Sequence, residues 1–134
     1  MSTRCLTVFY DGSGKEICVL YRHSDGYING HGKQLYNYLK DKKLGCLTLD
    51  KNKLIFNGME DLAAMVISHF KKEPGQFYLY AANKRDLWEN YIYHVTGKEE
   101  KIQIEVESVS KKTRCNLLDE LNILSMEECE TCPK

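Results

Sequence analysis

The sequence predicts a single α+β domain, in which two to three helices pack on a mainly antiparallel sheet of about five strands. Strand-like segments rich in β-branched and aromatic residues are interspersed with segments whose apolar residues recur at helical spacing. No internal repeat or low-complexity linker divides the chain, and its 134 residues are the usual length of one domain. We expect residues 1–110 to form the compact part and residues 111–134 to add a docked helix and a polar tail.

The chain is expected to begin with a β-hairpin. Residues 5–10 and 17–21 are rich in β-branched and aromatic side chains, which favour strands. Between them, residues 11–14 read Asp-Gly-Ser-Gly, and glycine adopts the positive φ of a tight turn without steric cost.

Two helices are predicted in the middle of the chain. The first is expected from about Lys33 to Leu44, with Gly45 as its C-terminal cap. The second follows Asn57, which forms a capping-box pattern with Glu60 before apolar residues at helical period. Between them, residues 46–49 and 54–56 could form a small hairpin around a turn at 50–53.

Three further strands and a last helix complete the prediction. Pro74-Gly75 ends the second helix, and residues 77–82, 91–96 and 101–106 then have strand-like composition. From residue 111 onward, leucines at helical spacing predict a helix that gives way to a polar tail.

Composition limits the classes of partner. Lysine plus arginine and aspartate plus glutamate number 19 each, so the whole chain has no net attraction for nucleic acid. The N-terminus lacks the pattern of a secretory signal, and no apolar run approaches the ~20 residues of a membrane span. We therefore expect a cytoplasmic location and neither a nucleic-acid nor a membrane partner.

The first candidate site is the polar, glycine-containing loop from Arg22 to Gly32. Arg22 could grip a phosphate with its guanidinium, near the positive end of the following helix. His23 and His31 could donate hydrogen bonds, Asp25 could orient Arg22 or a ribose hydroxyl, and Tyr27 could form an aromatic wall. These parts fit an anionic, nucleotide-like ligand.

Two other interpretations of this loop are kept open. In one, Arg22 and Asp25 form an internal salt bridge and Tyr27 fills the core. In the other, His23, Asp25 and His31 support metal-assisted phosphoester hydrolysis, since imidazole both binds metals and titrates near neutrality. Their spacing matches no known catalytic signature, and the chain has no nucleophile or phosphate-loop motif, so a non-catalytic binding protein without a cofactor is favoured.

Arg85 and Trp88 form a second candidate site, because an aromatic plane beside an arginine can stack a base. The alternative is that Trp88 fills the core and Arg85 pairs with Asp86 on the surface. Six cysteines are present, and we expect Cys5, Cys18 and Cys46 to be reduced thiols in the core.

The cysteines near the C-terminus form a weaker pattern. Cys129-x-x-Cys132 has the spacing of half a zinc site, with Cys115 as a conceivable third ligand. No second pair lies nearby to complete the ligand set, so incidental thiols are favoured.

Three segments carry a family resemblance. They are Met-Ser-Thr-Arg at the start, residues 20–27 (Leu-Tyr-Arg-His-Ser-Asp-Gly-Tyr) with Gly30-His31-Gly32, and residues 57–64 (Asn-Gly-Met-Glu-Asp-Leu-Ala-Ala). Over about residues 1–96 the chain resembles a family of short phage and bacterial proteins of uncharacterised function. The resemblance implies no activity, cofactor or site residue, but small phage proteins often bind and neutralise a host component.

The leading hypothesis is therefore a small cytoplasmic, phage-related protein that binds an anionic small molecule such as a nucleotide through the Arg22–Gly32 loop. Two alternatives remain, a small hydrolase and a protein that inhibits a host protein through the helix after Asn57 or an exposed strand edge. Symmetric homo-oligomers are the common state of soluble proteins, so self-association is also considered.

Overall fold

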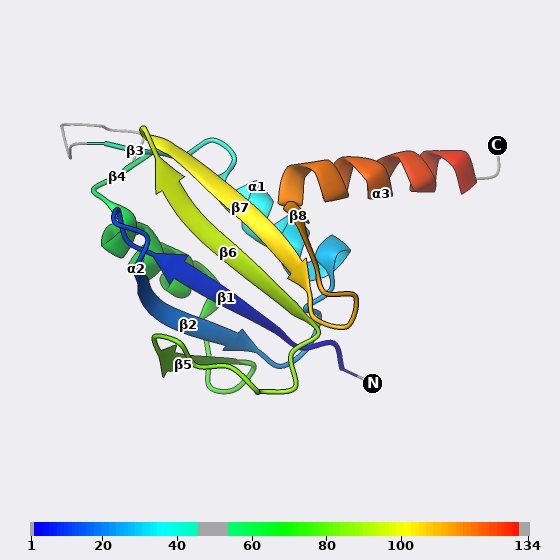
Figure 1. Cartoon of the computed structure of the whole chain (residues 1–134), viewed down its shortest axis with the longest axis horizontal. Helices are drawn as coiled ribbons and strands as arrows, with labels where there is room; N and C mark the ends of the chain where they lie inside the picture. Colours follow the sequence, from blue (N-terminus) through cyan, green and yellow to red (C-terminus); the bar gives the residue numbers. More distant parts are fainter. Residues whose placement is uncertain (1, 46–53, 132–134) are drawn as a thin grey trace.

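The computed structural model describes residues 2–45 and 54–131, which form an α+β fold with one large sheet (Figure 1). The elements in chain order are β1 (Cys5–Tyr10), β2 (Glu16–Arg22), a π-helical turn η1 (Ile28–Gly32), α1 (Lys33–Leu39), β3 (Lys43–Leu44), β4 (Ile55–Phe56), α2 (Met59–Phe70), β5 (Phe77–Ala81), β6 (Tyr91–Lys98), β7 (Lys101–Ser108), β8 (Thr113–Asn116) and α3 (Leu117–Thr131).

The large sheet has six strands in the order β5-β2-β1-β6-β7-β8. Its neighbouring strands are antiparallel except β1 and β6, which run parallel with Cys5 opposite Tyr91. The short strands β3 and β4 form a separate parallel pair. The predicted fold class is confirmed, although the sheet has more strands than expected.

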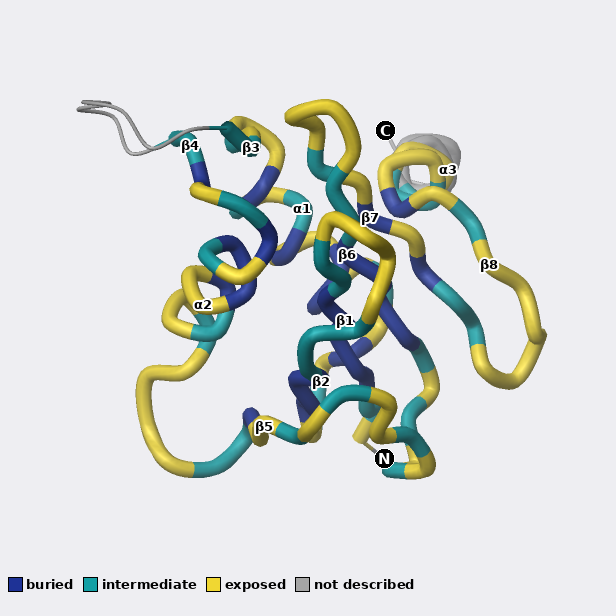
Figure 2. The backbone as a smooth tube through the Cα atoms, turned by 60° about the vertical axis from the view of Figure 1, so that its left-hand side comes forward, coloured by how far each residue is buried: buried dark blue, intermediate teal, exposed yellow. Residues whose placement is uncertain are grey.

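One face of the sheet is covered by α1 and α2 and carries the main core (Figures 1 and 2). Because successive side chains of a strand point to opposite faces, Cys5 and Phe9 of β1 face the helices. In α2, the predicted helical period places Leu62 and Val66 on the buried side, where neither is exposed.

The opposite face carries a second, smaller apolar cluster, and no helix of the described residues covers it. It is built from Leu6, Val8, Val19, Tyr21 and Ile92, all of them buried. The connection from β5 to β6, residues 82–90, crosses this face and packs Leu87 on the cluster.

Several predicted boundaries are wrong. The helix expected to reach Leu44 ends at Leu39, because β3 begins at Lys43 and pairs with β4. At the start of α2, the N–H of Asn57 is accepted by Asp61 at 2.8 Å, and the cap position is held by Gly58 rather than by Asn57. The segments predicted at 46–49 and 50–53 lie outside the described residues.

The C-terminal region also differs from the prediction. Residues 113–116 form strand β8, which sequence periodicity missed because its side chains are polar. The helix then begins at Leu117 and continues to Thr131, where a polar tail was expected. Leu117 is fully buried, whereas the later turns of α3 extend away from the sheet (Figure 1).

Side chains of three cysteines are described, and a fourth cysteine, Cys129, lies within α3. Cys5 is buried in the core as predicted, whereas Cys18, which was also expected there, and Cys115 are partly buried; all three are free thiols. Cys46 and Cys132 lie outside the described residues. In the described ranges, no helix is both long and apolar enough to cross a membrane.

Candidate functional site

Arg22 lies inside the protein, at the end of β2, rather than on the surface of its loop. Its side chain is 8% exposed, and its guanidinium stands 5.0 Å above the ring of Phe77. The Nη1 atom donates to Oε1 of Gln34 at 2.7 Å and contacts Nδ1 of His31 at 3.1 Å. Arg22 therefore already holds internal partners from η1 and α1.

These contacts determine the protonation state of His31. An arginine can only donate, so Nδ1 of His31 must accept and Nε2 must carry the hydrogen that is donated to Oγ1 of Thr7 at 2.7 Å. Burial and the neighbouring Arg22 charge lower the pKa of His31 from 6.5 to about 3. The ring is therefore neutral, with both nitrogens committed.

The other predicted loop residues lie on the outside. His23 is exposed and contacts the hydroxyl of Tyr21, while Asp25 is 58% exposed and lies 4.0 Å from Arg22. Tyr27 is 45% exposed, so it does not fill the core. Arg22 and His31 therefore face inward while His23, Asp25 and Tyr27 face outward, and the ligand role of this loop stays a prediction.

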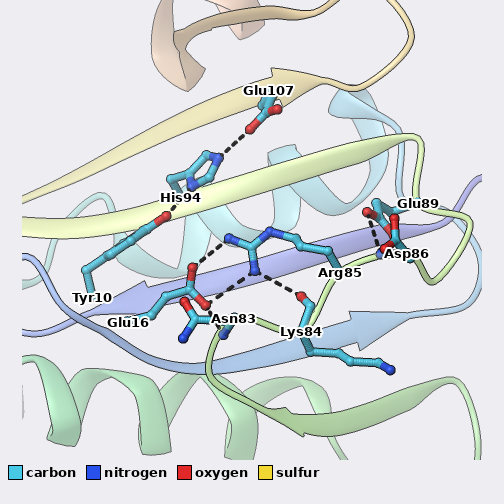
Figure 3. A network of polar contacts seen from close by, with 9 residues as sticks. All are labelled: Tyr10, Glu16, Asn83, Lys84, Arg85, Asp86, Glu89, His94 and Glu107. Atoms are coloured by element: carbon cyan, nitrogen blue, oxygen red, sulfur yellow. Dashed lines mark hydrogen bonds and ion pairs between the residues drawn. The ribbon is translucent and has the colours of Figure 1, made fainter.

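The two residues of the second predicted site, Arg85 and Trp88, have different surroundings. Arg85 pairs with Glu16 at 2.6 Å rather than with Asp86, and it anchors the connection over the open face (Figure 3). Trp88, expected in the core, is 84% exposed, and its neighbour Leu87 takes the buried position instead. Arg85 is therefore engaged by Glu16, and Trp88 is exposed to solvent instead of packing in the core.

A hydrogen-bonded chain on the open face was not predicted (Figure 3). The Tyr10 hydroxyl lies 2.7 Å from Nδ1 of His94, and Nε2 of His94 lies 2.8 Å from Oε1 of Glu107. Burial lowers the pKa of His94, while the bond to Glu107 opposes that change. Burial raises the pKa of Tyr10. The one sequence signal for this chain is that Glu105 and Glu107 alternate with apolar residues along β7, which indicates that one face of the strand is polar.

A hollow with a volume of about 450 Å³ lies where α1, β3, β7 and the start of α3 meet. Small-molecule sites usually measure about 300–1,000 Å³. Its apolar side chains are Leu39, Ile102, Ile104, Leu117 and Leu118, and Tyr36 lies beside them. We call this hollow the basic pocket, because four lysines also line it: Lys40, Lys42, Lys43 and Lys101.

Three of those lysines make no ion pair or side-chain hydrogen bond within the described residues. Lys42 donates to the carbonyl of Tyr38 at 2.9 Å and pairs with Asp41. Lys40, Lys43 and Lys101 are exposed and have no ion pair or side-chain hydrogen bond in the part of the chain that the structure describes. Their ammonium groups therefore remain available to an anion.

The turn between β6 and β7 forms another wall of the basic pocket. Its central residues Glu99 and Glu100 both have positive φ, at 51° and 69°, a conformation that costs energy for non-glycine residues. The carbonyl of Glu100 accepts the N–H of Leu44 at 2.9 Å, which ties this turn to β3. The pocket wall is thus held in place by a contact between segments far apart in sequence.

Within residues 2–45 and 54–131 there is no group of three or more histidine, cysteine, aspartate or glutamate residues placed to hold a metal. Comparisons of the chain with protein-family models, with curated proteins and with solved structures found no match.

Proposed function

We propose that this protein is a non-catalytic, cytoplasmic binding protein for an anionic, nucleotide-like small molecule, and that the basic pocket is its binding site. One observation carries the proposal: a hollow of about 450 Å³ combines an apolar lining with three lysines that make no ion pair or side-chain hydrogen bond among the described residues. Such a combination suits a ligand with an apolar or aromatic part and a negatively charged part.

The lining suggests how the ligand would lie. A planar base would rest against Tyr36 and the apolar side chains of Leu39 and Ile104. Phosphate oxygens would then meet the ammonium groups of Lys43 and Lys101 at the rim. Glu99 and Glu100 would disfavour a ligand that extends its negative charge toward the turn.

The resemblance to short phage and bacterial proteins adds context. A phage protein that sequesters a nucleotide signal of its host would need affinity and no turnover, so the absence of a catalytic motif in the sequence is compatible with it. The ligand class is the one that the Arg22–Gly32 loop suggested, whereas the site is moved to side chains that are accessible.

A thermal-shift screen against nucleoside mono-, di- and triphosphates and cyclic nucleotides tests the proposal. A ligand at about 100 times its dissociation constant stabilises the folded state by about 2.7 kcal/mol, which is readily measured as a rise in Tm. The double variant Lys43→Glu with Lys101→Glu should lose this rise, because it reverses two charges at the pocket rim. Lys111→Glu, an exposed charge reversal in the β7–β8 turn, should keep it.

Two further arms distinguish the two sites. His23→Ala changes an exposed residue of the Arg22–Gly32 loop, so loss of the thermal shift in this variant alone would place the ligand there. An equal shift in the pocket variant and in the wild type would overturn the pocket assignment. No shift with any nucleotide would contradict the proposed ligand class.

A further inference from the structure

Strand β5 forms one edge of the sheet, and its backbone geometry shows which groups face outward. The N–H of His23 donates to the carbonyl of Gln76 at 2.9 Å, just before β5. Because hydrogen-bonding direction alternates along an antiparallel strand, Tyr78 and Tyr80 bond to β2 and Leu79 points its N–H and carbonyl away from it. No strand of the described residues pairs with that outer side.

The groups on either side of Leu79 are partly occupied. The carbonyl of Phe77 accepts a hydrogen bond from Nζ of Lys71 at 2.8 Å, and the N–H of Phe77 donates to the carbonyl of Gly75 at 2.7 Å. The carbonyl of Ala81 accepts from the N–H of Lys84. Among the described residues, the N–H and carbonyl of Leu79 and the N–H of Ala81 have no hydrogen-bond partner.

The side chains of β5 are unusual for an edge strand. The segment Phe-Tyr-Leu-Tyr-Ala contains no charge and no proline, the features by which proteins commonly prevent edges from pairing. Leu79 is 60% exposed and Tyr78 is 47% exposed. At the other edge, β8 carries Arg114, which pairs with Glu105 of its neighbour β7. The two edges of one sheet therefore differ in the charge that the edge strand itself carries.

We propose that β5 pairs antiparallel with β5 of a second copy of this chain, about a two-fold axis at Leu79. Leu79 would then exchange both of its backbone hydrogen bonds with Leu79 of the other copy. The N–H of Ala81 would donate to the carbonyl of Phe77 in the other copy, which has a second lone pair beside its bond to Lys71. The two sheets would become one continuous sheet.

A second copy fits this edge because the strand is complementary to itself. With Leu79 at the axis, Tyr78 of one copy faces Tyr80 of the other, and no charged side chain within the strand is buried. Tyr78 and Tyr80 already contact Tyr21 of β2, at centroid distances of 5.9 Å and 6.4 Å. Pairing would extend this group of tyrosines across the axis.

Flanking charges set the conditions under which the dimer forms. Nζ of Lys71 lies 5.6 Å from the Tyr78 ring, and Nζ of Lys84 lies 5.7 Å from the Tyr80 ring. The two-fold axis brings Lys71 of one copy toward Lys84 of the other, and salt screens such repulsion. The dimer is therefore expected to be weak and to tighten as salt rises.

Sedimentation equilibrium of the full chain, from micromolar to millimolar concentration and at low and high salt, tests the proposal. A monomer–dimer equilibrium whose dissociation constant falls with salt is expected. Leu79→Lys places a charge at the axis and should raise that constant at least about tenfold. Leu79→Pro removes the outward N–H, which makes no bond to β2, and should weaken the dimer. Ile123→Lys, an equally polar change at an exposed apolar residue of α3, should leave association unchanged.

Three outcomes would overturn the inference. The chain could remain a monomer at millimolar concentration in high salt. It could form a dimer that Leu79→Lys and Leu79→Pro leave intact, which would place the interface elsewhere. Or the dimer could weaken as salt rises. That result would indicate that opposite charges hold the two copies together, which the uncharged strand β5 cannot supply. Far-ultraviolet circular dichroism of each variant shows whether it is folded.

Discussion

The two faces of the sheet each bury a histidine, and the two rings are held in different ways. His31 lies on the helix-covered face, is fully buried and contacts Arg22 and Thr7. His94 lies on the open face, is 3% exposed and contacts Tyr10 and Glu107. One ring has a cation beside it, and the other has a carboxylate.

This difference decides what each ring can do. Protonation of His31 would put a second positive charge beside Arg22 and break an accepted hydrogen bond. His94 can take up a proton, since Glu107 would pair with the cation and the Tyr10 oxygen could accept the new hydrogen. Burial alone therefore does not decide whether a histidine can be protonated. The hydrogen-bond partners of its two ring nitrogens decide it.

The largest effect on this comparison should come from Arg22→Ala. The substitution leaves Nδ1 of His31 and Oε1 of Gln34 without their donor and opens a void beside Phe77. We expect a loss of about 3 kcal/mol in the free energy of unfolding, measured by urea denaturation. Arg22→Met, which fills most of the volume, should lose less. A loss below about 1 kcal/mol for Arg22→Ala would show that Arg22 does not hold this face together.

Removing the hydroxyl from each histidine network should have unequal costs. Thr7→Val leaves the N–H of a fully buried ring without an acceptor, so we expect a loss of about 2 kcal/mol. Tyr10→Phe acts at a partly exposed position where water can replace the hydroxyl, so we expect about 0.5 kcal/mol. Equal losses in urea denaturation would contradict the distinction between the faces.

The pH dependence of stability should report on His31. Its folded pKa of about 3 lies below its unfolded value of 6.5, so only the unfolded chain binds the proton between these values. The contribution is complete above pH 6.5 and is lost as pH falls toward 3. We expect about 1.5 kcal/mol of loss between pH 6.5 and 5, above the range where carboxylates titrate.

His31→Gln, which retains a donor and an acceptor, should flatten this part of the stability profile. Nuclear magnetic resonance gives an independent check, because the His31 ring signals should not move as pH changes near neutrality. Titration of the His31 ring near neutrality would contradict its assignment as a locked neutral group.

Glu107→Gln should act mainly on the pKa of His94 and little on stability. The carboxylate of Glu107 favours the protonated form of His94, so its neutralisation should lower the pKa of His94 further. Glu105→Gln, on the same strand and paired with Arg114, is the matched control and should change that pKa less. Ring chemical shifts against pH measure both, and stability should change by less than about 1 kcal/mol in either variant.

The elements that sequence predicted well depend on local chemistry. The β1–β2 hairpin follows from Gly14, whose φ of 88° suits the turn, and α2 follows from a strong helical period. The failures have long-range causes: α1 ends early because β3 pairs with a distant segment, and β8 has polar side chains whose strand character comes from β7. Leu87 replaced Trp88 in the core because the 82–90 connection crosses the open face.

The same division holds for the candidate sites. The sequence by itself determined the fold class, the position of the first hairpin and the polar character of the Arg22–Gly32 loop, because composition and spacing act between residues close in the chain. Only the tertiary structure decided that Arg22 and His31 face inward, that three lysines border an apolar hollow, and that β5 is an edge. Each of these depends on which distant segments meet, and no local pattern encodes that choice.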